Sequence, residues 1–242
     1  MQPKISVIIP AYNEEKLIGQ CIDAVSKQTL PRENYEILVI NNNSTDKTAE
    51  IARKHGAKVH NYTEKQGFLP AKQFGTSLAQ ADIVAYTDAD SLPDKTWLET
   101  IYTLLQRNPQ LVCVGGTILA TSNVTVNVML ILYDVLAQIN QLFGISLIWS
   151  PNMALRKSAF LKVNGFNEKL VRCDDWDLVM RLQKTFGVRS ILYTTKLKVR
   201  TSPRRQQHIM EFISYFYYGV INYFIILIFR QSKAIGALKP IQ

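Results

Sequence analysis

Cysteine is scarce in this chain, which has three cysteines among its 242 residues. Cys21, Cys113 and Cys173 are odd in number, and their spacing matches neither a zinc motif nor a disulfide framework. We therefore expect reduced thiols, which are typical of cytoplasmic proteins. The first residues run directly into a strand pattern, so we also expect no signal peptide.

Acidic residues are absent between residues 178 and 210, where lysine and arginine recur. This stretch concentrates positive charge in a chain whose formal net charge is +9. Such an excess favours an anionic partner, which is nucleic acid, an acidic membrane surface or a phosphorylated substrate. We expect no nucleic acid, because the basic stretch precedes an apolar segment and contains no RNA-binding signature.

Charge is almost absent from residues 124–149, where Asp134 is the single charged side chain. Apolar residues recur there three or four positions apart, while Asn127, Asp134 and Gln141 fall seven apart. This pattern predicts a mostly apolar helix with a narrow polar stripe. Such a helix is either packed within the protein or lies on a membrane or a second chain, as in a homodimer.

Residues 212–229 carry no charge and lie between Glu211 and Arg230. Their length is at the lower limit for a membrane span, and their several tyrosines favour the headgroup level. We predict a membrane-associating apolar helix and tail in residues 206–242, tilted or in plane, at the cytoplasmic face. The alternative is a buried dimerisation helix.

What the chain does have is a regular alternation of two patterns. Short apolar runs of strand length, at residues 5–9, 35–40, 57–60 and 83–87, alternate with helical periodicity. This alternation predicts βαβ units and an α/β fold with a mostly parallel sheet. Residues 92–94 are predicted to begin a helix, residues 97–105 to form an amphipathic helix and residues 111–118 to form a strand.

The loops after parallel strands meet at one edge of the sheet, where ligands bind. We expect residues 10–14, 41–46 and 88–90 to come together there. Asp88 and Asp90 follow a strand at i, i+2 spacing, which suits a divalent cation that also binds the oxygens of a phosphorylated substrate. The alternative is a solvated turn.

Three motifs in order carry a family resemblance. Ile-Pro-Ala-Tyr-Asn-Glu-Glu (9–15), Asn-Asn-Asn-Ser-Thr-Asp (41–46) and Thr-Asp-Ala-Asp-Ser (87–91) resemble the family 2 glycosyltransferases. The resemblance covers roughly residues 4–205 and implies a catalytic domain in residues 1–205. It also implies the glycosyltransferase-A fold, a Rossmann-like, mostly parallel central sheet flanked by helices, here followed by the C-terminal apolar helix.

The resemblance assigns a nucleotide-sugar donor and a divalent metal, Mn2+ or Mg2+, held by Asp88 and Asp90. A UDP-sugar is the favoured donor, although Asn41–Asn43 stand where the family often has Asp-Asp-Gly, which weakens that choice. Lys72 stands in an arginine position and would meet the diphosphate as a point charge, or is simply an exposed helix lysine. The implied donor-binding residues are Pro10, Ala11, Tyr12, Glu14, Asn42, Lys72, Asp88, Ala89, Asp90, Arg204 and Arg205.

A second acidic group, Asp-Asp-Trp-Asp-Leu at residues 174–178, resembles the family's catalytic acid motif. The resemblance implies that Asp175 is the general base of inverting transfer, with Asp174 beside it and Asn152 and Trp176 on the acceptor side. Crowded carboxylates raise one another's pKa, which suits a proton acceptor near neutral pH. The alternative is an ordinary acidic helix N-terminus.

The resemblance thus implies transfer of a sugar from a nucleotide diphosphate to a hydroxyl of a lipid-linked or glycan acceptor. A polyprenyl-phosphate acceptor is an alternative, but it is already ionised and would need no base. A sugar-phosphate nucleotidyltransferase would need a glycine-rich phosphate loop after the first strand, which the sequence lacks. A non-catalytic membrane scaffold that retains the fold is the remaining alternative.

Overall fold

The structure is a computed structural model that describes residues 2–120, 124–168, 170 and 174–202. Arg204, Arg205 and the predicted C-terminal helix lie outside these residues. The strands are β1 (Ile5–Ala11), β2 (Tyr35–Asn41), β3 (Lys58–Asn61), β4 (Ile83–Tyr86), β5 (Ser91–Pro93), β6 (Cys113–Ala120), β7 (Met153–Arg156) and β8 (Ile191–Thr201). The α-helices are α1 (Ile18–Ser26), α2 (Thr48–Lys54), α3 (Phe68–Leu78), α4 (Trp97–Arg107), α5 (Val124–Leu142), α6 (Lys157–Lys162) and α7 (Asp174–Phe186).

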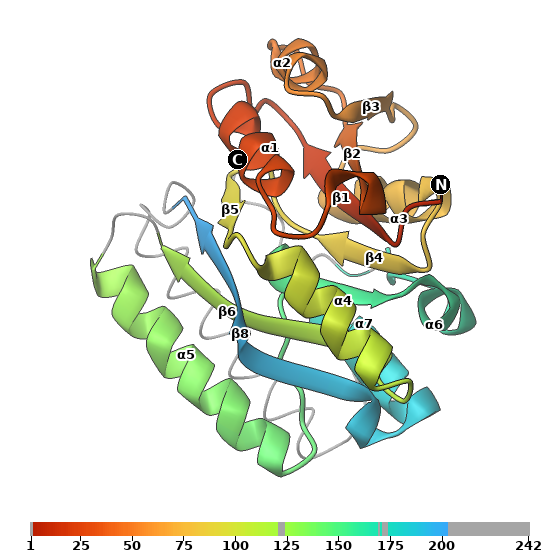
Figure 1. Ribbon diagram of the computed structural model, residues 1–242, viewed down its shortest axis with the longest axis vertical. Helices are drawn as coiled ribbons and strands as arrows, with labels where there is room; N and C mark the ends of the chain where they lie inside the picture. Colours follow the sequence, from red (N-terminus) through yellow and green to blue (C-terminus); the bar gives the residue numbers. More distant parts are fainter. Residues whose placement is uncertain (1, 121–123, 169, 171–173, 203–242) are drawn as a thin grey trace.

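The strands form one sheet in the order β3-β2-β1-β4-β7-β6-β8-β5 (Figure 1). Strands β1, β2, β3 and β4 are parallel to one another, and β6 is parallel to β8. Strand β7 enters between β4 and β6 and is antiparallel to both, and β5 is antiparallel to β8. The expected α/β fold with a mostly parallel sheet flanked by helices is therefore confirmed.

Helices cover both faces of the sheet because the buried strands are apolar on both sides. Alternate β1 residues point to opposite layers: Val7 packs with α1 and α4, whereas Ile8 packs with α3. The second layer also receives apolar side chains of α6 and α7. This double cover leaves the strand ends, rather than the faces, available for polar chemistry.

Two element boundaries differ from the sequence prediction. Residues 92–94 do not begin a helix, because Ser91–Pro93 form β5 and pair with Val199–Thr201 of β8. Helix α4 begins at Trp97 instead. The helix predicted within residues 124–149 ends at Leu142, and Gly144 follows with a positive φ of 75° that a helix cannot continue through.

Helix α5 lies along the β6 and β8 side of the sheet (Figure 1). Its polar stripe faces the sheet: Asp134 accepts hydrogen bonds from the hydroxyls of Thr117 and Tyr193. Its apolar stripe is exposed, with Ile131 at 52% and Val135 at 46% exposure. Within the described residues, the packing in the core predicted for this helix therefore holds for its polar stripe and not for its apolar stripe. None of the helices in the described part of the chain is long and apolar enough to cross a membrane.

Candidate active site

The loops after β1 and β2 are tied to each other by side-chain to backbone hydrogen bonds. The Glu14 N–H donates to the Thr48 hydroxyl at 2.7 Å, and the Thr45 N–H donates to the Asn13 side-chain carbonyl at 2.8 Å. Asn13 has a φ of 52°, a left-handed conformation that asparagine tolerates better than most residues. These bonds fix the β1 loop against the β2 loop at the carboxyl edge of the sheet, as predicted.

A pocket opens between these loops and the N-terminus of α3. One of its lining residues is Tyr12, which is 45% exposed and follows directly on β1. The complete lining consists of Pro10, Ala11, Tyr12, Asn42, Gln66, Gly67, Phe68 and Ala71. A pocket with a flat aromatic ring, backbone edges and an amide at the end of parallel strands suits a nucleoside. Four predicted donor-binding residues therefore share one concavity.

Asn42 connects the pocket lining to loop 62–67. Its side-chain amide donates to the carbonyls of Tyr62 and Lys65 at 3.0 and 2.9 Å, and its carbonyl accepts from the Gly67 N–H at 2.7 Å. The side chain is buried, with both amide hydrogens committed to loop 62–67. Asn42 thus shapes the pocket, and direct base recognition by its remaining carbonyl lone pair stays a prediction.

Asp88 and Asp90 lie at the end of β4, on the same edge of the sheet. Asp90 is 8% exposed, and its Oδ1 lies 3.4 Å from the Ser91 hydroxyl and 3.3 Å from the Thr201 hydroxyl. The Ser91 N–H donates to the Asp88 carbonyl at 3.0 Å, which closes a tight turn between the two carboxylates. Cys21 lies beneath this turn, and burial followed by the charges of Asp90 and Asp88 raises the pKa of its thiol.

The residues present fit a divalent cation of the predicted kind. Within the described residues no third carboxylate, histidine or cysteine joins Asp88 and Asp90 in a metal-binding group. Mg2+ and Mn2+ are commonly bound by one or two carboxylates and completed by substrate phosphates and water. Asp88 and Asp90 would supply such a partial ligand set at the sheet edge that also carries the pocket.

Helix α7 begins with a pair of carboxylates, Asp174 and Asp175. The Ser150 N–H donates to Oδ2 of Asp175 at 2.9 Å, whereas the buried Oδ1 of Asp175 has no hydrogen-bond partner. Burial, and next the charge of Asp175, raise the pKa of Asp174 to about 8. Asp174 is therefore largely protonated near neutral pH.

Lys72 is part of this acidic centre. It is 5% exposed, so the alternative of an exposed helix lysine is wrong. Its Nζ hydrogen-bonds the Ser150 hydroxyl and lies 3.9 Å from Oδ1 of Asp175. Lys72 lowers the pKa of Asp174, against the larger effects of burial and Asp175. Its predicted contact with the donor diphosphate stays a prediction.

The predicted acceptor-side residues differ in their surroundings. Asn152 is fully buried, and its side chain bonds Trp97, Thr117 and Leu197, which joins α4, β6 and β8. These bonds give Asn152 a structural role. They do not favour its predicted contact with the acceptor, which stays a prediction. Trp176 is 8% exposed, and its indole nitrogen is buried without a hydrogen-bond partner.

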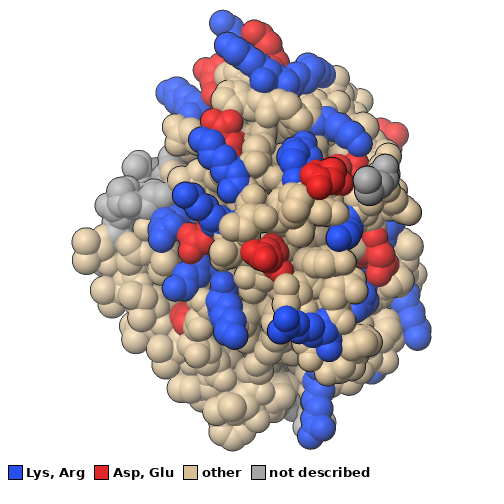
Figure 2. All heavy atoms as spheres, viewed as in Figure 1, with Lys and Arg blue, Asp and Glu red and all other residues tan. Residues whose placement is uncertain are grey.

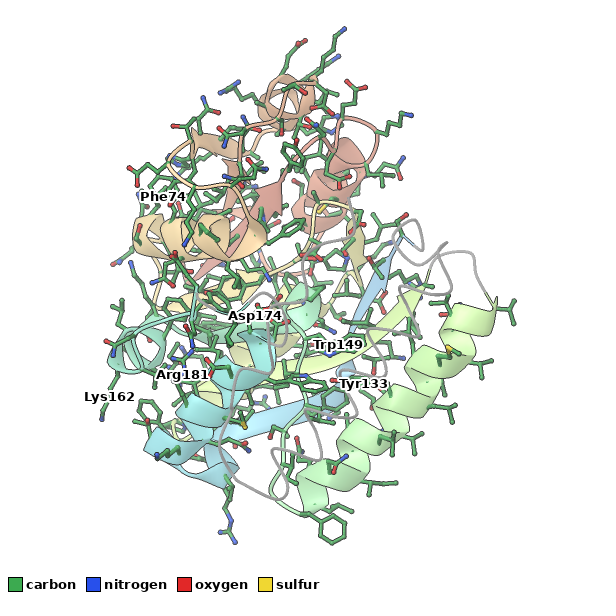
Figure 3. The ribbon with its side chains drawn as sticks, turned by 180° about the vertical axis from the view of Figure 1, so that it is seen from behind. Phe74, Tyr133, Trp149, Lys162, Asp174 and Arg181 are labelled. Atoms are coloured by element: carbon green, nitrogen blue, oxygen red, sulfur yellow. The ribbon has the colours of Figure 1, made fainter. Side chains whose placement is uncertain are left out.

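Two further aromatic residues near the acid pair, Trp149 and Tyr133, were not predicted as site residues. Trp149 stacks on Tyr133 of α5 with ring centroids 4.2 Å apart. Figure 3 shows both rings between α5 and the start of α7, where Asp174 lies. Ser150 was also missed, although it contacts both Lys72 and Asp175. The Trp149-Ser150-Pro151 stretch carries no charge, so only its place in the fold reveals its role.

Comparison with known proteins identifies the family. Residues 6–163 match the family model described as Glycosyl transferase family 2. Because this match covers more than half of the 242 residues, the chain belongs to that family. The resemblance drawn from the three sequence motifs is therefore confirmed.

Curated relatives match over part of their length. The chain is 41% identical to Glycosyltransferase AglE of Haloferax volcanii over 102 residues, covering 40% of this chain and 34% of that protein. It is 28% identical to the probable glycosyltransferase YdaM of Bacillus subtilis over 203 residues, covering 74% of this chain and 46% of that protein. The chain thus spans less than half the length of either relative.

Solved structures share the fold. The mannosyltransferase PcManGT of Pyrobaculum calidifontis, in complex with GDP-Man and Mn2+, superposes with a TM-score of 0.69 at 20% identity. That match covers 97% of this chain and 66% of the other. TarS 1-349 of S. aureus, in complex with UDP-GlcNAc, gives 0.67 at 20% identity, covering 82% and 58%. These neighbours confirm the glycosyltransferase-A type of α/β fold.

Proposed function

We propose that the chain is the catalytic domain of an inverting, metal-dependent glycosyltransferase that uses a nucleotide-diphosphate sugar. The supporting observation is the arrangement along one sheet edge of the nucleoside pocket, Asp88 with Asp90, and the Asp174–Asp175 pair. Separate positions for the leaving group and the base suit displacement from opposite faces of the sugar. A UDP-sugar is the favoured donor, while a neighbour with this fold holds GDP-Man.

In the proposed reaction the acceptor hydroxyl attacks the anomeric carbon as its proton passes to the side chain of Asp175. The bond from the anomeric carbon to the diphosphate oxygen breaks, and the nucleoside diphosphate leaves with both bonding electrons. A divalent cation held by Asp88 and Asp90 would offset negative charge on the leaving diphosphate. Asp174, neutral near pH 7 because its pKa is raised to about 8, avoids a second buried charge beside the base.

The acceptor is proposed to be a hydroxyl of a lipid-linked or glycan molecule. One relative, from Methanococcus voltae, is named as acting on a dolichyl N-acetyl-glucosaminyl phosphate. It is 34% identical over 142 residues, covering 54% of this chain. A polyprenyl-phosphate acceptor is less well supported, since it would leave a carboxylate such as Asp175 without a proton to accept. The corresponding location is the cytoplasmic face of a membrane, with residues 206–242 as the attachment.

Calorimetric titration of the detergent-purified chain with UDP-, GDP- and dTDP-sugars tests the donor and metal proposals. We expect one nucleotide to bind with Mn2+ present, EDTA to abolish binding, and renewed Mn2+ to restore it. Asp90→Asn should lose the Mn2+-dependent part of the binding. Asp82→Asn is a matched control, because Asp82 precedes β4 at the opposite end of the strand. Absence of binding across the panel in folded protein would favour the non-catalytic scaffold.

A further inference from the structure

Helix α5 is amphipathic with its polarity reversed relative to an ordinary surface helix. Its narrow polar stripe points inward, where Asn127 bonds the backbone of Ala120 and Gln141 bonds the backbone of Tyr193. These bonds replace water for the polar groups and fix the rotation of the helix about its axis. The rotation leaves the wide apolar stripe facing away from the protein.

The exposed stripe is continuous along the whole helix. Its members are large apolar side chains, each at least 46% exposed: Val124, Val128, Ile131, Leu132, Val135, Leu136, Ile139, Leu142 and the adjoining Phe143. Elsewhere in the described residues, exposed large apolar side chains occur singly or in pairs, as at Leu161 of α6. In Figure 2 the surface over α5 is largely free of lysine, arginine and acidic side chains. A soluble monomer seldom exposes an apolar area of this extent.

We propose that the outward face of α5 lies in the headgroup and acyl boundary of an anionic lipid bilayer. The helix has 19 residues and is therefore about 28 Å long, which suits a helix lying in the membrane plane. It cannot cross the bilayer, because its polar stripe is bonded to β6 and β8.

Two features of the surrounding chain favour a bilayer over another protein surface. Strand β8 ends at Thr201, which pairs with Ala120 a few residues before α5, so the chain leaves the sheet beside this helix. The sequence beyond Thr201 contains the uncharged residues 212–229. If these residues packed on α5 as a helix, they would cover its apolar stripe, but their own outer side would stay apolar and exposed. A bilayer covers both stretches at once.

The distribution of basic side chains near α5 also favours an anionic lipid bilayer. Lys196 and Lys198 are exposed on β8, the strand that borders α5, and Arg189 is exposed just before it. Arg200 is also exposed on β8, but its guanidinium is paired with Asp94 at 2.6 Å. Basic residues near a membrane surface add attraction to anionic lipids. The inference goes beyond glycosyl transfer and would also bring a lipid-linked acceptor to the Tyr133 side of the acid pair.

Site-specific fluorescence on the full chain tests this orientation. In a Cys173→Ser background, Ile131→Cys and the control Leu161→Cys, whose native side chains are 52% and 58% exposed, carry an environment-sensitive label. Each protein is diluted below the critical micelle concentration into phosphatidylcholine–phosphatidylglycerol vesicles. We expect the label at residue 131 to shift to the blue and to be quenched by brominated lipid, and the label at residue 161 to stay unchanged.

Two results would overturn the proposal. If the emission of the label at residue 131 does not change when the protein binds vesicles, residues 206–242 alone attach the chain. A blue-shifted label before vesicles are added would mean that the C-terminal segment or a second copy covers α5. Nucleotide-sugar binding by the labelled proteins is measured in parallel, so loss of donor binding counts against the proposed reaction and not against the membrane face.

Discussion

The two sides of the active site are stabilised in different ways. On the donor side, loops after β1 and β2 are joined by reciprocal hydrogen bonds, and the Asn42 side chain bonds three backbone groups. On the side of α7, buried polar atoms of the neighbouring Asp175 and Trp176 have no hydrogen-bond partner. The donor side also has such atoms, at Asn41 and Thr87, but they belong to separate strand ends.

This difference separates a preformed part of the site, the loops after β1 and β2, from a part that is not fully hydrogen-bonded, the start of α7. A buried polar atom without a partner costs free energy, so such atoms mark strain or a group that meets a substrate. A bonded loop, in contrast, presents a fixed shape to a nucleoside. We therefore expect substitutions on the donor side to change binding and stability, and substitutions at the acid pair to change turnover.

The largest expected effect follows replacement of the proposed base. Asp175→Asn keeps the size of the side chain but removes its capacity to accept a proton. We expect turnover to fall by about 10²–10⁴-fold, the usual contribution of a general base, with donor affinity little changed. Steady-state transfer assays and donor titration measure the two quantities.

Asp23→Asn provides the control for this substitution, since Asp23 lies on α1 and is paired with His55 at 2.7 Å. Its turnover should equal that of the wild type. Unchanged turnover in Asp175→Asn would reject the base assignment. It would also reject the expectation that substitutions at the acid pair change turnover.

An intermediate effect is expected on the donor side. Asn42→Ala removes the bonds that hold loop 62–67, and the free energy of unfolding should fall by about 1–3 kcal/mol, the cost of leaving such groups unpaired. Donor affinity should weaken while turnover at saturating donor stays near the wild-type value. Denaturant unfolding and hydrogen exchange at residues 62–67 measure the loss.

Asn43→Gly is the neighbouring control, because glycine accepts the φ of 64° at this position and only a side-chain bond to Gln66 is lost. If both variants lose equal stability and donor affinity, the specific role of Asn42 is wrong.

A third expected effect is a change in how stability depends on pH. The pKa of Asp174 rises from 3.8 to about 8 on folding, so the folded state binds more protons between these pH values. The free energy of unfolding of the wild type should therefore fall as pH rises through this window and then level off. Asp174→Asn, which is neutral throughout, should lose this part of the dependence and be relatively more stable at pH 8.

Denaturant unfolding of both proteins across this pH range measures the difference. Parallel curves for wild type and Asp174→Asn would show that the carboxyl titrates normally, and that the acid pair is not strained.

Much of the fold was readable from the sequence because its signals are local. Short, mostly apolar, β-branched runs such as Ile5–Ile9 are typical of buried strands, and the periodicity of α4 predicts its core face at Trp97, Leu98 and Ile101. The placement of Asp88 and Asp90 after β4 needed only the strand and its direction. Strand β5 was missed because a strand of three residues forms only through its pairing with β8.

The sequence by itself determined the α/β alternation, the family, the polar loops at one sheet edge and the acidic start of α7. The tertiary structure alone decided which partners those polar groups meet, because hydrogen bonds and burial join residues far apart in the chain. It placed Lys72 beside Asp175, committed Asn42 to loop 62–67 and enclosed Asn152 between β6 and β8. It also turned the polar stripe of α5 inward, since buried Tyr193 and Thr117 offered that stripe better partners than water.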